Sequence, residues 1–562
     1  MRQKQQLPQG WSRTSLKEIT TSLGGGTPSK SDASFWTDGT IPWVSPKDMK
    51  SFHILSSEDL VTVAALNRLS LVPADSVLVV VRSGILSRTF PVGLSAMPAT
   101  INQDMRAFVP MDGISSRFLA WQLVAREREI LSSCSKHGTT VASIEGPALS
   151  AFPLVLAPSA EQTRIVAKLE ELLSDLDAGV AELKAAQAKL AQYRQSLLKA
   201  AVEGALTTDW RARRAALETD CPAQPGDAEN RPRPAEFHAS FAAGQRRRHE
   251  TPPTGGCAVQ EDSADGFETG AQLLARILTE RRARWEARQL ARFQSQGKNP
   301  PKGWQSKYPE PVAPDTRDLP ELPEGWVWAT VDQLGDVQLG RQRSPDKLKG
   351  NSPTKYIRAA NITERGIDFR DVFSMDFSEH ERETFALHAG DVLLTEASGS
   401  AEHVGRPAIW PEVDDLYCFQ NTVLRFSPCG ISSDFAYFSF LAMQKLGQFR
   451  KLSAGVGINH LSAGKFSKLP IALPPRAEQQ ELVRALRQEF EHCDHQTTAL
   501  EQIRTESAAQ RQNLLKAAFS GQLVPQDPND EPASVLLERV RAERVAGAAG
   551  KAPRGRRARE TV

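Results

Sequence analysis

The residues most able to do chemistry lie near one another in the second half of the chain. His492, Cys493 and His495 are close in sequence, and thiolate and imidazole are ligands that zinc prefers. Cys493 also falls on a seven-residue apolar stripe, with both histidines flanking it on a polar edge. The six cysteines include no Cys-x-x-Cys pair, so neither a zinc ribbon nor a disulfide framework is indicated. We expect no metal, and a His/Cys metal site is the alternative.

Motifs for catalysis on nucleotides are incomplete. Residues 299–302 read Asn-Pro-Pro-Lys, but the corresponding loop of adenine methyltransferases needs an aromatic to stack a flipped base, which Lys302 cannot do. No Gly-x-x-x-x-Gly-Lys-Ser/Thr phosphate loop occurs, and Pro345-Asp346 lacks the Glu-x-Lys of a nuclease. Residues 24–26 (Gly-Gly-Gly) could cradle a phosphate, although a turn explains them better. We therefore predict no catalytic residue and no cofactor.

The bulk composition indicates a globular protein of several domains. A chain of 562 residues exceeds the size at which a single core stops growing. Charged residues make up 24%, hydrophobic residues 40%, and the net charge of +2 does not by itself indicate a polyanionic partner. The polar start does not resemble a signal peptide, and the longest apolar run, residues 77–81, is too short to span a bilayer. We expect a reduced cytoplasmic protein without membrane contact.

An internal duplication is the dominant feature of the sequence. Short segments recur in the same order at nearly constant spacing: 7–11 with 322–326, 160–162 with 477–479, and 197–201 with 514–518. The stretches after Gly26 and Gly340 differ almost completely. Each half therefore has a shared frame carrying a divergent part, which suggests two related tasks on different targets. Residues 77–81 and 392–394 read as buried strands.

Two segments lie outside the main repeat. Residues 208–270 are rich in Pro, Arg, Ala and Glu and have no apolar period, so we expect a flexible linker. A third match, 273–277 with 536–540, has a different spacing because this segment is long in the first half. The basic tail from Gly547 is expected to be disordered, with a phosphate contact as the alternative.

A long helix is predicted after Pro158 and again in the second copy. Both copies carry an apolar heptad stripe, which indicates a coiled coil. The stripe consists of Leu169, Leu176, Leu183, Leu190 and Leu197, matched by Leu486, Cys493, Leu500 and Leu514. Because pairing within one chain costs less entropy than dimerisation, we expect an antiparallel pair. A homodimeric zipper and an ordinary amphipathic helix packed on its own domain are the alternatives.

The order of these motifs resembles the specificity subunit of type I restriction–modification systems. The resemblance covers both repeats, about residues 7–207 and 320–525. In the first half it is carried by 7–11, Gly-Gly-Thr-Pro-Ser at 25–29, 41–49, Glu161-Gln162 and 197–204. In the second half it is carried by 322–326, 389–394, 474–479 and 514–523. Two features depart from the family: the second copy has Leu-Gly-Arg-Gln-Arg at 339–343 instead of Gly-Gly-Thr-Pro, and the segment 208–318 is unusually long.

The resemblance implies a DNA-reading protein that is not itself an enzyme. Each globular domain would read one half of a split double-stranded DNA site. The helices would set the distance between the halves and dock two methyltransferase subunits. Restriction/translocase subunits would join through the complex, and methylation and cleavage would reside in these partner subunits. The competing classes are a fused methyltransferase-nuclease and a structural coiled-coil protein.

The expected fold class is α+β, with two pseudo-repeated target recognition domains separated by two long antiparallel coiled-coil helices. The expected boundaries are domain 1 at 1–157, helix 1 at 158–207, a linker at 208–318 with a basic helix near 271–293, domain 2 at 319–474, helix 2 at 475–525, and a C-terminal helix and tail at 526–562.

Candidate DNA contacts follow from the same resemblance. Arginine and lysine are suited to phosphate contacts, and arginine also to bidentate contacts with guanine. In domain 1 the candidates are Lys30, Lys47, Arg82, Arg88 and Arg106. In domain 2 they are Arg341, Arg343, Lys347, Lys349, Arg358, Arg365 and Arg406. An ordinary solvated charge is the alternative at each position.

Overall fold

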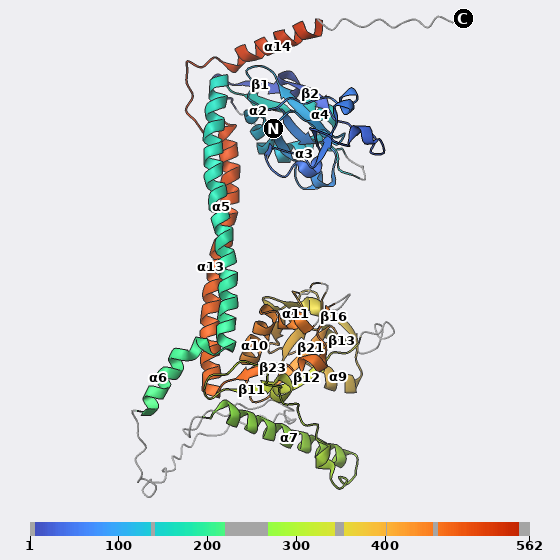
Figure 1. Ribbon diagram of the computed structural model, residues 1–562, viewed down its shortest axis with the longest axis vertical. Helices are drawn as coiled ribbons and strands as arrows, with labels where there is room; N and C mark the ends of the chain where they lie inside the picture. Colours follow the sequence, from blue (N-terminus) through green and yellow to red (C-terminus); the bar gives the residue numbers. More distant parts are fainter. Residues whose placement is uncertain are drawn as a thin grey trace, which may run out of the picture. The chain divides into compact units, whose positions relative to one another are not determined.

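The chain folds into two compact units, of which unit 1 joins two segments that are distant in sequence and unit 2 is one continuous segment. The computed structural model describes residues 6–136, 141–219, 268–342, 353–398, 400, 402–452 and 459–549. Unit 1 comprises Met1–Ala186 and Ala499–Val562, and unit 2 comprises Gln187–Thr498. Two long helices, α5 (Ser159–Val202) and α13 (Arg476–Ala518), contribute residues to both units (Figure 1). In the described part of the chain, no helix has the length and apolarity needed to cross a membrane.

The globular part of unit 1, called domain 1 below, contains a five-stranded sheet with the order β2-β9-β6-β7-β4. A three-stranded sheet, β5-β3-β8, and the pair β1-β10 accompany it. The strands are β1 (Ser12–Ser15), β2 (Thr20–Gly24), β3 (Ile41–Val44), β4 (His53–Ile54), β5 (Asp59–Val61), β6 (Val77–Val80), β7 (Val92–Ser95), β8 (Thr100–Ile101), β9 (Met105–Pro110) and β10 (Pro153–Leu156). All four residues of β6 are buried, which confirms the predicted core strand.

Short helices cover this sheet. They are α1 (Leu16–Ile19), α2 (Ser116–Ala125), α3 (Glu127–Cys134) and α4 (Gly146–Ser150). Ser115 caps α2 by accepting a hydrogen bond from the Phe118 N–H, so the helix begins where a capping side chain stands before an apolar run. Helix α2 packs against β6 and β7 and closes the core of the domain.

Domain 2, the globular part of unit 2, repeats most of the strand order of domain 1, but its larger sheet has four described strands where that of domain 1 has five, and it has two further strand pairs. Its sheets have the orders β12-β21-β17-β19 and β16-β13-β20, and β11 pairs with β23. The strands are β11 (Val327–Thr330), β12 (Gly335–Leu339), β13 (Pro353–Ile357), β14 (Ile362–Thr363), β15 (Gly366–Ile367), β16 (Phe373–Asp376), β17 (Val392–Thr395), β18 (Ala397–Ser398), β19 (Pro407–Ile409), β20 (Tyr417–Phe419), β21 (Val423–Pro428), β22 (Asn459–His460) and β23 (Pro470–Leu473). Strands β3 and β8 pair in parallel, as do β13 and β20. The repeat seen in the sequence is therefore a repeat of topology.

The helices of domain 2 correspond in the same way, except for the one between β16 and β17, which has no α-helical counterpart among the described residues of domain 1. They are α8 (Val331–Leu334), α9 (Glu379–Phe385), α10 (Ser433–Lys445), α11 (Gln448–Leu452) and α12 (Ala463–Phe466). Ser432 caps α10 as Ser115 caps α2, and α10 packs on β17 and β19. The core strand β17 is buried along its length, as predicted.

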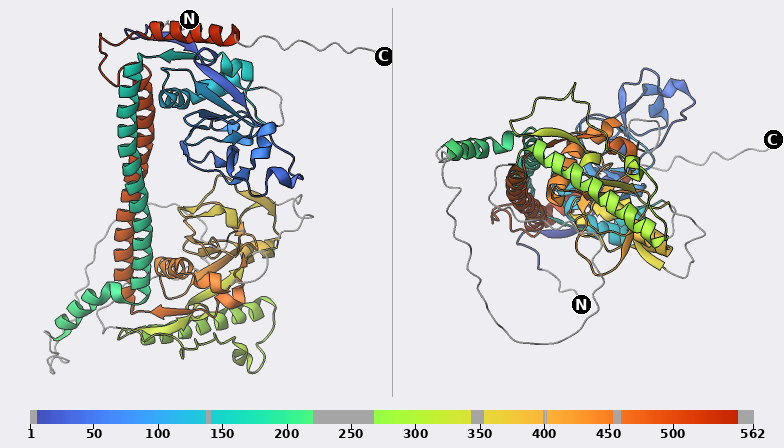
Figure 2. Two further views of the ribbon diagram at one scale, coloured as in Figure 1. Left: turned by 45° about the horizontal axis from the view of Figure 1, so that its top comes forward. Right: turned by 90° about the horizontal axis from the view of Figure 1, so that it is seen from below.

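A further helix completes each domain from outside the main repeat. In unit 2, α7 (Gly270–Ser295) packs on α8 and β11, and in unit 1, α14 (Ala533–Ala549) packs on α1 (Figures 1 and 2). The Gly270 N–H donates to the Gly325 carbonyl, and the Ala533 N–H donates to the Gly10 carbonyl. The third match in the sequence therefore marks one more structural element of the repeat.

The segment expected to be a linker differs from that expectation at its start. Residues Thr208–Thr219 form helix α6, which the sequence did not predict because it lacks an apolar period. Its Arg211 side chain reaches the buried Glu478 carboxylate, so a polar contact holds the first turn in place. Residues 220–267 of the expected linker and 550–562 of the expected tail lie outside the described residues.

Helices α5 and α13 run antiparallel within each unit. In unit 1, Arg511 donates to Asp177 at 2.6 Å, and Arg164 donates to Asp530 beyond the end of α13. In unit 2, the Tyr193 hydroxyl donates to Glu489 at 3.0 Å. Figure 2 shows the two helices side by side within each unit. The fold is thus α+β, with two related domains and a pair of long antiparallel helices.

Candidate nucleic-acid interface

The divergent parts of domain 1 meet at one end of its central sheet. Strand β2 ends at Gly24, which pairs with Arg106 near the start of β9, and β6 ends beside Met105. The loop after β2 is held here because the Gly26 N–H donates to the Ile101 carbonyl. We call this place the loop end of domain 1.

Two of the candidate arginines lie together at this end. Arg82 follows β6, and its Nε donates to the Asp104 carboxylate at 2.6 Å. Arg106 lies on β9, directly opposite Val79 in the ladder. The Arg82 side chain is 57% exposed, so it keeps access to solvent although Asp104 offsets part of its charge. The fold therefore brings together two arginines that are distant in sequence.

The other candidates of domain 1 are more spread out. Lys30 and Arg88 are exposed residues of loops, after β2 and after a 3-10 turn respectively. Lys47 contacts Glu58 at 3.1 Å and Asp59 at 3.0 Å, and these carboxylates raise the pKa of its ammonium. Lys47 is thus already paired with acidic side chains, which makes it a weaker candidate for a phosphate contact than Lys30 or Arg88.

Domain 2 has an equivalent loop end, formed by different side chains. Strand β17 ends at Thr395 opposite Val423, the first residue of β21. The Arg406 N–H donates to the Thr395 hydroxyl there, and the Ala359 N–H, next to Arg358, donates to the Thr422 hydroxyl. Arg358 and Arg406 therefore border this end.

The side chains of the domain 2 candidates have distinct surroundings. The Arg358 guanidinium lies 3.9 Å from the centre of the Phe373 ring and pairs with Asp371, an arrangement that fixes its plane. Arg365 is exposed in the turn between β14 and β15. Arg343, Lys347 and Lys349 lie outside the described residues.

The Arg341 side chain is buried and bonded within domain 2, so it is not accessible from solvent. Its side chain is 8% exposed, and its Nε donates to Glu381 at 2.8 Å. One amino group donates to the Asp376 carbonyl, and the guanidinium faces the Phe377 ring. Sequence reasoning chose Arg341 for its charge, but the burial of this side chain removes it from direct contact with a duplex.

The predicted helix-pair residues fall into two groups by burial. Buried residues are Leu169, Leu197, Leu486 and Cys493, and half-buried residues are Leu176, Leu183, Leu190, Leu500 and Leu514. Leu169 belongs to a core cluster of unit 1, and Leu197 and Leu486 belong to a core cluster of unit 2. Cys493 is buried outside these clusters, and half-buried positions predominate along the rest of the stripe. The stripe thus leaves apolar surface partly open to solvent.

His492, next to Cys493, has an ordinary hydrogen-bond partner. The His492 ring nitrogen lies 2.7 Å from the Gln496 amide nitrogen, and Cys493 is buried. Within the described ranges, no group of three or more His, Cys, Asp or Glu side chains is arranged to hold a metal ion.

A buried hydrogen bond that sequence reasoning missed joins each domain to its long helix. The Trp11 indole N–H donates to Glu161 at 3.1 Å, and the Trp326 indole N–H donates to Glu478 at 2.9 Å. The glycine before each tryptophan has φ near +80°, which forms the tight turn that aims the ring. The recurrence of both motifs at nearly the same spacing was the available signal, because two motifs that recur together can be in contact.

Comparison with known proteins identifies the family. A model described as the type I restriction modification DNA specificity domain matches residues 8–185 and 323–505, which is more than half of the chain. The chain belongs to this family. Each matched segment covers one globular domain and the first part of the long helix that follows it, so the family match follows the internal repeat.

Individual members of this family match the chain either over a short stretch or at low identity. The chain is 39% identical over 188 residues to the EcoR124I/EcoR124II specificity subunit of Escherichia coli, covering 32% of this chain and 46% of that protein. It is 22% identical over 464 residues to the EcoDI specificity subunit of Escherichia coli, covering 78% of this chain and 79% of that protein. The chain thus spans about half the length of the first of these relatives.

A solved structure supports the same fold. It is described as showing complex assembly and conformational transition of the type I R-M system, and one of its chains aligns with a TM-score of 0.59. The alignment covers 92% of this chain and 99% of that chain at 14% identity, so the likeness concerns the fold alone.

Proposed function

We propose that this chain is the DNA-recognition subunit of a type I restriction–modification complex, in which each domain reads one half of a bipartite double-stranded site. The observation that carries this proposal is that domains 1 and 2 share most of their strand order but present different side chains at their loop ends. Base-edge contacts specify a sequence whereas the scaffold positions them. Two unlike loop ends on one scaffold therefore suit two unlike half-sites.

Exposed positive side chains on both domains support DNA as the ligand. Lys30, Arg82 and Arg88 of domain 1 and Arg365 of domain 2 are exposed. Arginine and lysine contacts with phosphate supply most of the non-specific affinity for DNA, and arginine also reads guanine. The small net charge is compatible with this role because local groups of positive side chains can bind phosphate in a chain whose overall charge is near zero.

Catalysis belongs to partner subunits in this proposal. Two methyltransferase subunits dock on α5 and α13, restriction/translocase subunits join through the complex, and the chain works in the cytoplasm without a cofactor. The half-buried leucines of the heptad stripe support the docking role because they offer apolar surface along the helices. A fused methyltransferase-nuclease is not favoured because the sequence lacks a complete methyltransferase motif and Pro345-Asp346 lacks the Glu-x-Lys of a nuclease.

Methylome sequencing of cells with and without the gene tests the proposal. The expected result is adenine methylation at one bipartite motif that disappears with the gene. Gel shifts with the methyltransferase partner should show preference for the same motif, and Arg88→Ala and Arg365→Ala should each weaken recognition of a different half-site. Methyl transfer by the isolated chain, or a motif without two halves, would contradict the proposal.

A further inference from the structure

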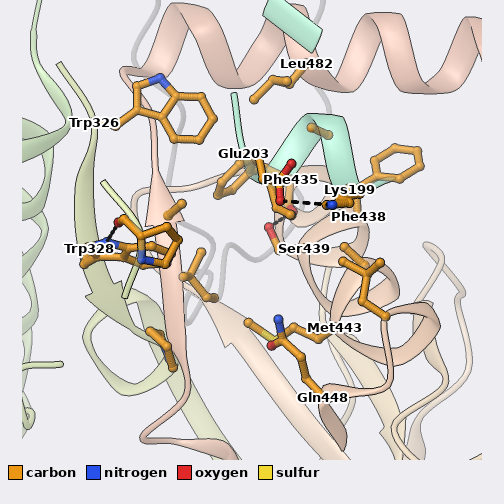
Figure 3. Close-up of a pocket in the computed structure, with 18 of the residues that line it drawn as sticks. Lys199, Glu203, Trp326, Trp328, Phe435, Phe438, Ser439, Met443, Gln448 and Leu482 are labelled. Atoms are coloured by element: carbon orange, nitrogen blue, oxygen red, sulfur yellow. Dashed lines mark hydrogen bonds and ion pairs between the residues drawn. The ribbon is translucent and has the colours of Figure 1, made fainter. Parts of the chain in front are cut away.

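A pocket of about 370 Å³ lies within unit 2, where the end of α5, helix α10 and the start of α13 meet β11 and β23 (Figure 3). Trp326, Phe435 and Phe438 form aromatic walls, and Leu482 and Met443 add apolar ones. Lys199 and Glu203, whose charged groups are 3.8 Å apart, lie at the α5 side. This volume is in the range of small-molecule sites, about 300–1,000 Å³.

The equivalent place in unit 1 is occupied by the chain itself. Phe435 corresponds to Phe118 in the repeat, and the Phe519 ring packs edge-on against Phe118 with centroids 5.3 Å apart. The residue of unit 2 at the position of Phe519 is Val202, which lines the pocket. An aromatic ring present in unit 1 is thus missing from unit 2, and the space it would take is open.

A side-chain amide is missing from the same place. In unit 1, Gln122 is buried, and its amide bonds both main-chain groups of Val155: Nε2 donates to the carbonyl at 2.8 Å, and Oε1 accepts from the N–H at 3.1 Å. The equivalent pair in unit 2 is Ser439 and Ala472, and both line the pocket. The Ser439 hydroxyl donates instead to the Phe435 carbonyl within α10.

The main chain of Ala472 therefore faces the pocket with its hydrogen-bonding groups available. Ala472 pairs with Trp328 in the same antiparallel register in which Val155 pairs with Arg13, so its N–H and C=O point toward α10 as those of Val155 do. Across the part of the chain that the structure describes, no side chain replaces the Gln122 amide at this position. Main-chain polar groups at a largely apolar site favour a ligand that bonds both of them.

We propose that this pocket is a binding site for a small planar aromatic molecule that carries a carboxamide group. The ring takes the place that Phe519 fills in unit 1, against the faces and edges of Trp326, Phe435 and Phe438. The carboxamide takes the place of the Gln122 side chain: its NH₂ donates to the Ala472 carbonyl, and its oxygen accepts from the Ala472 N–H. The site is independent of DNA recognition, because it belongs to the junction of α5, α10 and α13 and not to the loop end.

Ligand-observed NMR with benzamide as the probe and the full chain as the receptor tests the site. We expect saturable binding of benzamide, and binding about tenfold weaker for benzoate, whose carboxylate cannot donate to the Ala472 carbonyl. Val202→Phe restores the ring of unit 1, and Ser439→Gln restores its amide. Each variant fills the pocket from a different side, and each should abolish binding.

Ser507→Gln is the matched control. Ser507 also donates its hydroxyl to the carbonyl four residues earlier in a helix, but it lies on α13 in unit 1, away from the pocket. Far-UV circular dichroism and the melting temperature report whether each variant keeps its fold. Loss of binding in the two folded pocket variants, with binding retained in Ser507→Gln, supports the proposal. The proposal is overturned if the wild-type chain shows no saturable binding of benzamide. It is also overturned if folded Val202→Phe and folded Ser439→Gln both bind benzamide as well as the wild-type chain does.

Discussion

At the scale of single residues, the two buried glutamates that begin the long helices have unequal surroundings. Glu478 accepts hydrogen bonds from Trp326, from the Thr207 hydroxyl at 2.6 Å and from Arg211. Glu161 accepts only the Trp11 bond among the described contacts, and its other oxygen is buried without a partner. Burial therefore raises the pKa of Glu161 above its ordinary value of 4.5.

This difference predicts opposite effects of the same substitution. Because the folded-state pKa of Glu161 is raised, the folded chain holds this proton more tightly than the unfolded chain does. The contribution of the Glu161 carboxyl to the free energy of unfolding is fully present below pH 4.5, and it is lost as the pH rises through the folded-state pKa. A glutamine does not ionise, so Glu161→Gln should not lose stability at high pH in this way. The variant should therefore match or exceed the wild-type melting temperature at pH 8.

Glu478→Gln is the matched variant, and it should lower the free energy of unfolding by about 1–3 kcal/mol, because it leaves the partly buried Arg211 without its anion. Thermal melts of both variants and the wild type between pH 4 and pH 8 provide the measurement. Equal effects of the two substitutions would show that the Arg211 contact does not distinguish the two junctions.

Candidate contacts with DNA can be separated from structural charges by their salt dependence. Arg88→Ala should weaken binding of the assembled complex and lower the slope of log K against log salt by about 1, as expected for one lost phosphate contact. Arg341→Ala should instead lower the melting temperature, because Arg341 lies inside domain 2 against Glu381. Fluorescence anisotropy at several salt concentrations checks the slope. An unchanged slope for Arg88→Ala would remove this residue from the interface.

The sequence identifies basic residues of the divergent parts, but it does not show which of them are exposed and which are buried. Arg341 and Arg365 look alike in the sequence, yet Arg341 is buried by Glu381, forty residues away, whereas Arg365 is exposed in a turn. The partner of a charged side chain depends on the tertiary fold. The hydrogen bond between Trp11 and Glu161 was not predicted for the same reason, since 150 residues separate the two side chains.

At the scale of elements, the periodic parts were the most predictable. The heptad stripe required helices, and Pro158 and the Pro474-Pro475 pair placed their starts close to Ser159 and Arg476. The core strands were visible as short apolar runs. Helix α6 was not, because a helix held by Arg211 through a polar contact has no apolar period to detect.

The half-buried leucines of the stripe predict that substitutions there reduce binding of the methyltransferase partner. In unit 1, Leu183→Asp and Leu500→Asp should reduce binding of the methyltransferase partner, because each places a carboxylate on an apolar stripe. Lys184→Asp, at the neighbouring exposed position of α5, is the control and should retain binding. Co-purification and affinity measurements on the full chain test this. Retained partner binding in both leucine variants would count against docking on this stripe.

At the scale of the whole molecule, each unit depends on a helix supplied from outside the main repeat. Helices α7 and α14 correspond in detail: Arg281 of α7 donates to main-chain carbonyls at the end of α8, and Arg544 of α14 does so at the end of α1. In α7, Leu273 and Ile277 are buried in the unit 2 core, and in α14, Leu536, Leu537 and Val540 are buried in the unit 1 core. The sequence revealed the similarity of these helices but not their destinations, because α14 returns to a domain formed at the opposite end of the chain.

The return of α14 predicts that a C-terminal truncation damages the N-terminal domain. A chain ending at residue 525 loses α14 and exposes the core surface that Leu536, Leu537 and Val540 cover, each worth about 1.5–3 kcal/mol when fully buried. Protection of β6 against hydrogen exchange should therefore fall, whereas β17 in unit 2 should keep its protection because α7 is intact. A chain ending at residue 549 retains α14 and is the control. Equal protection of β6 in both truncated chains would mean that domain 1 folds without this helix, and equal losses in β6 and β17 would mean that the units do not unfold separately.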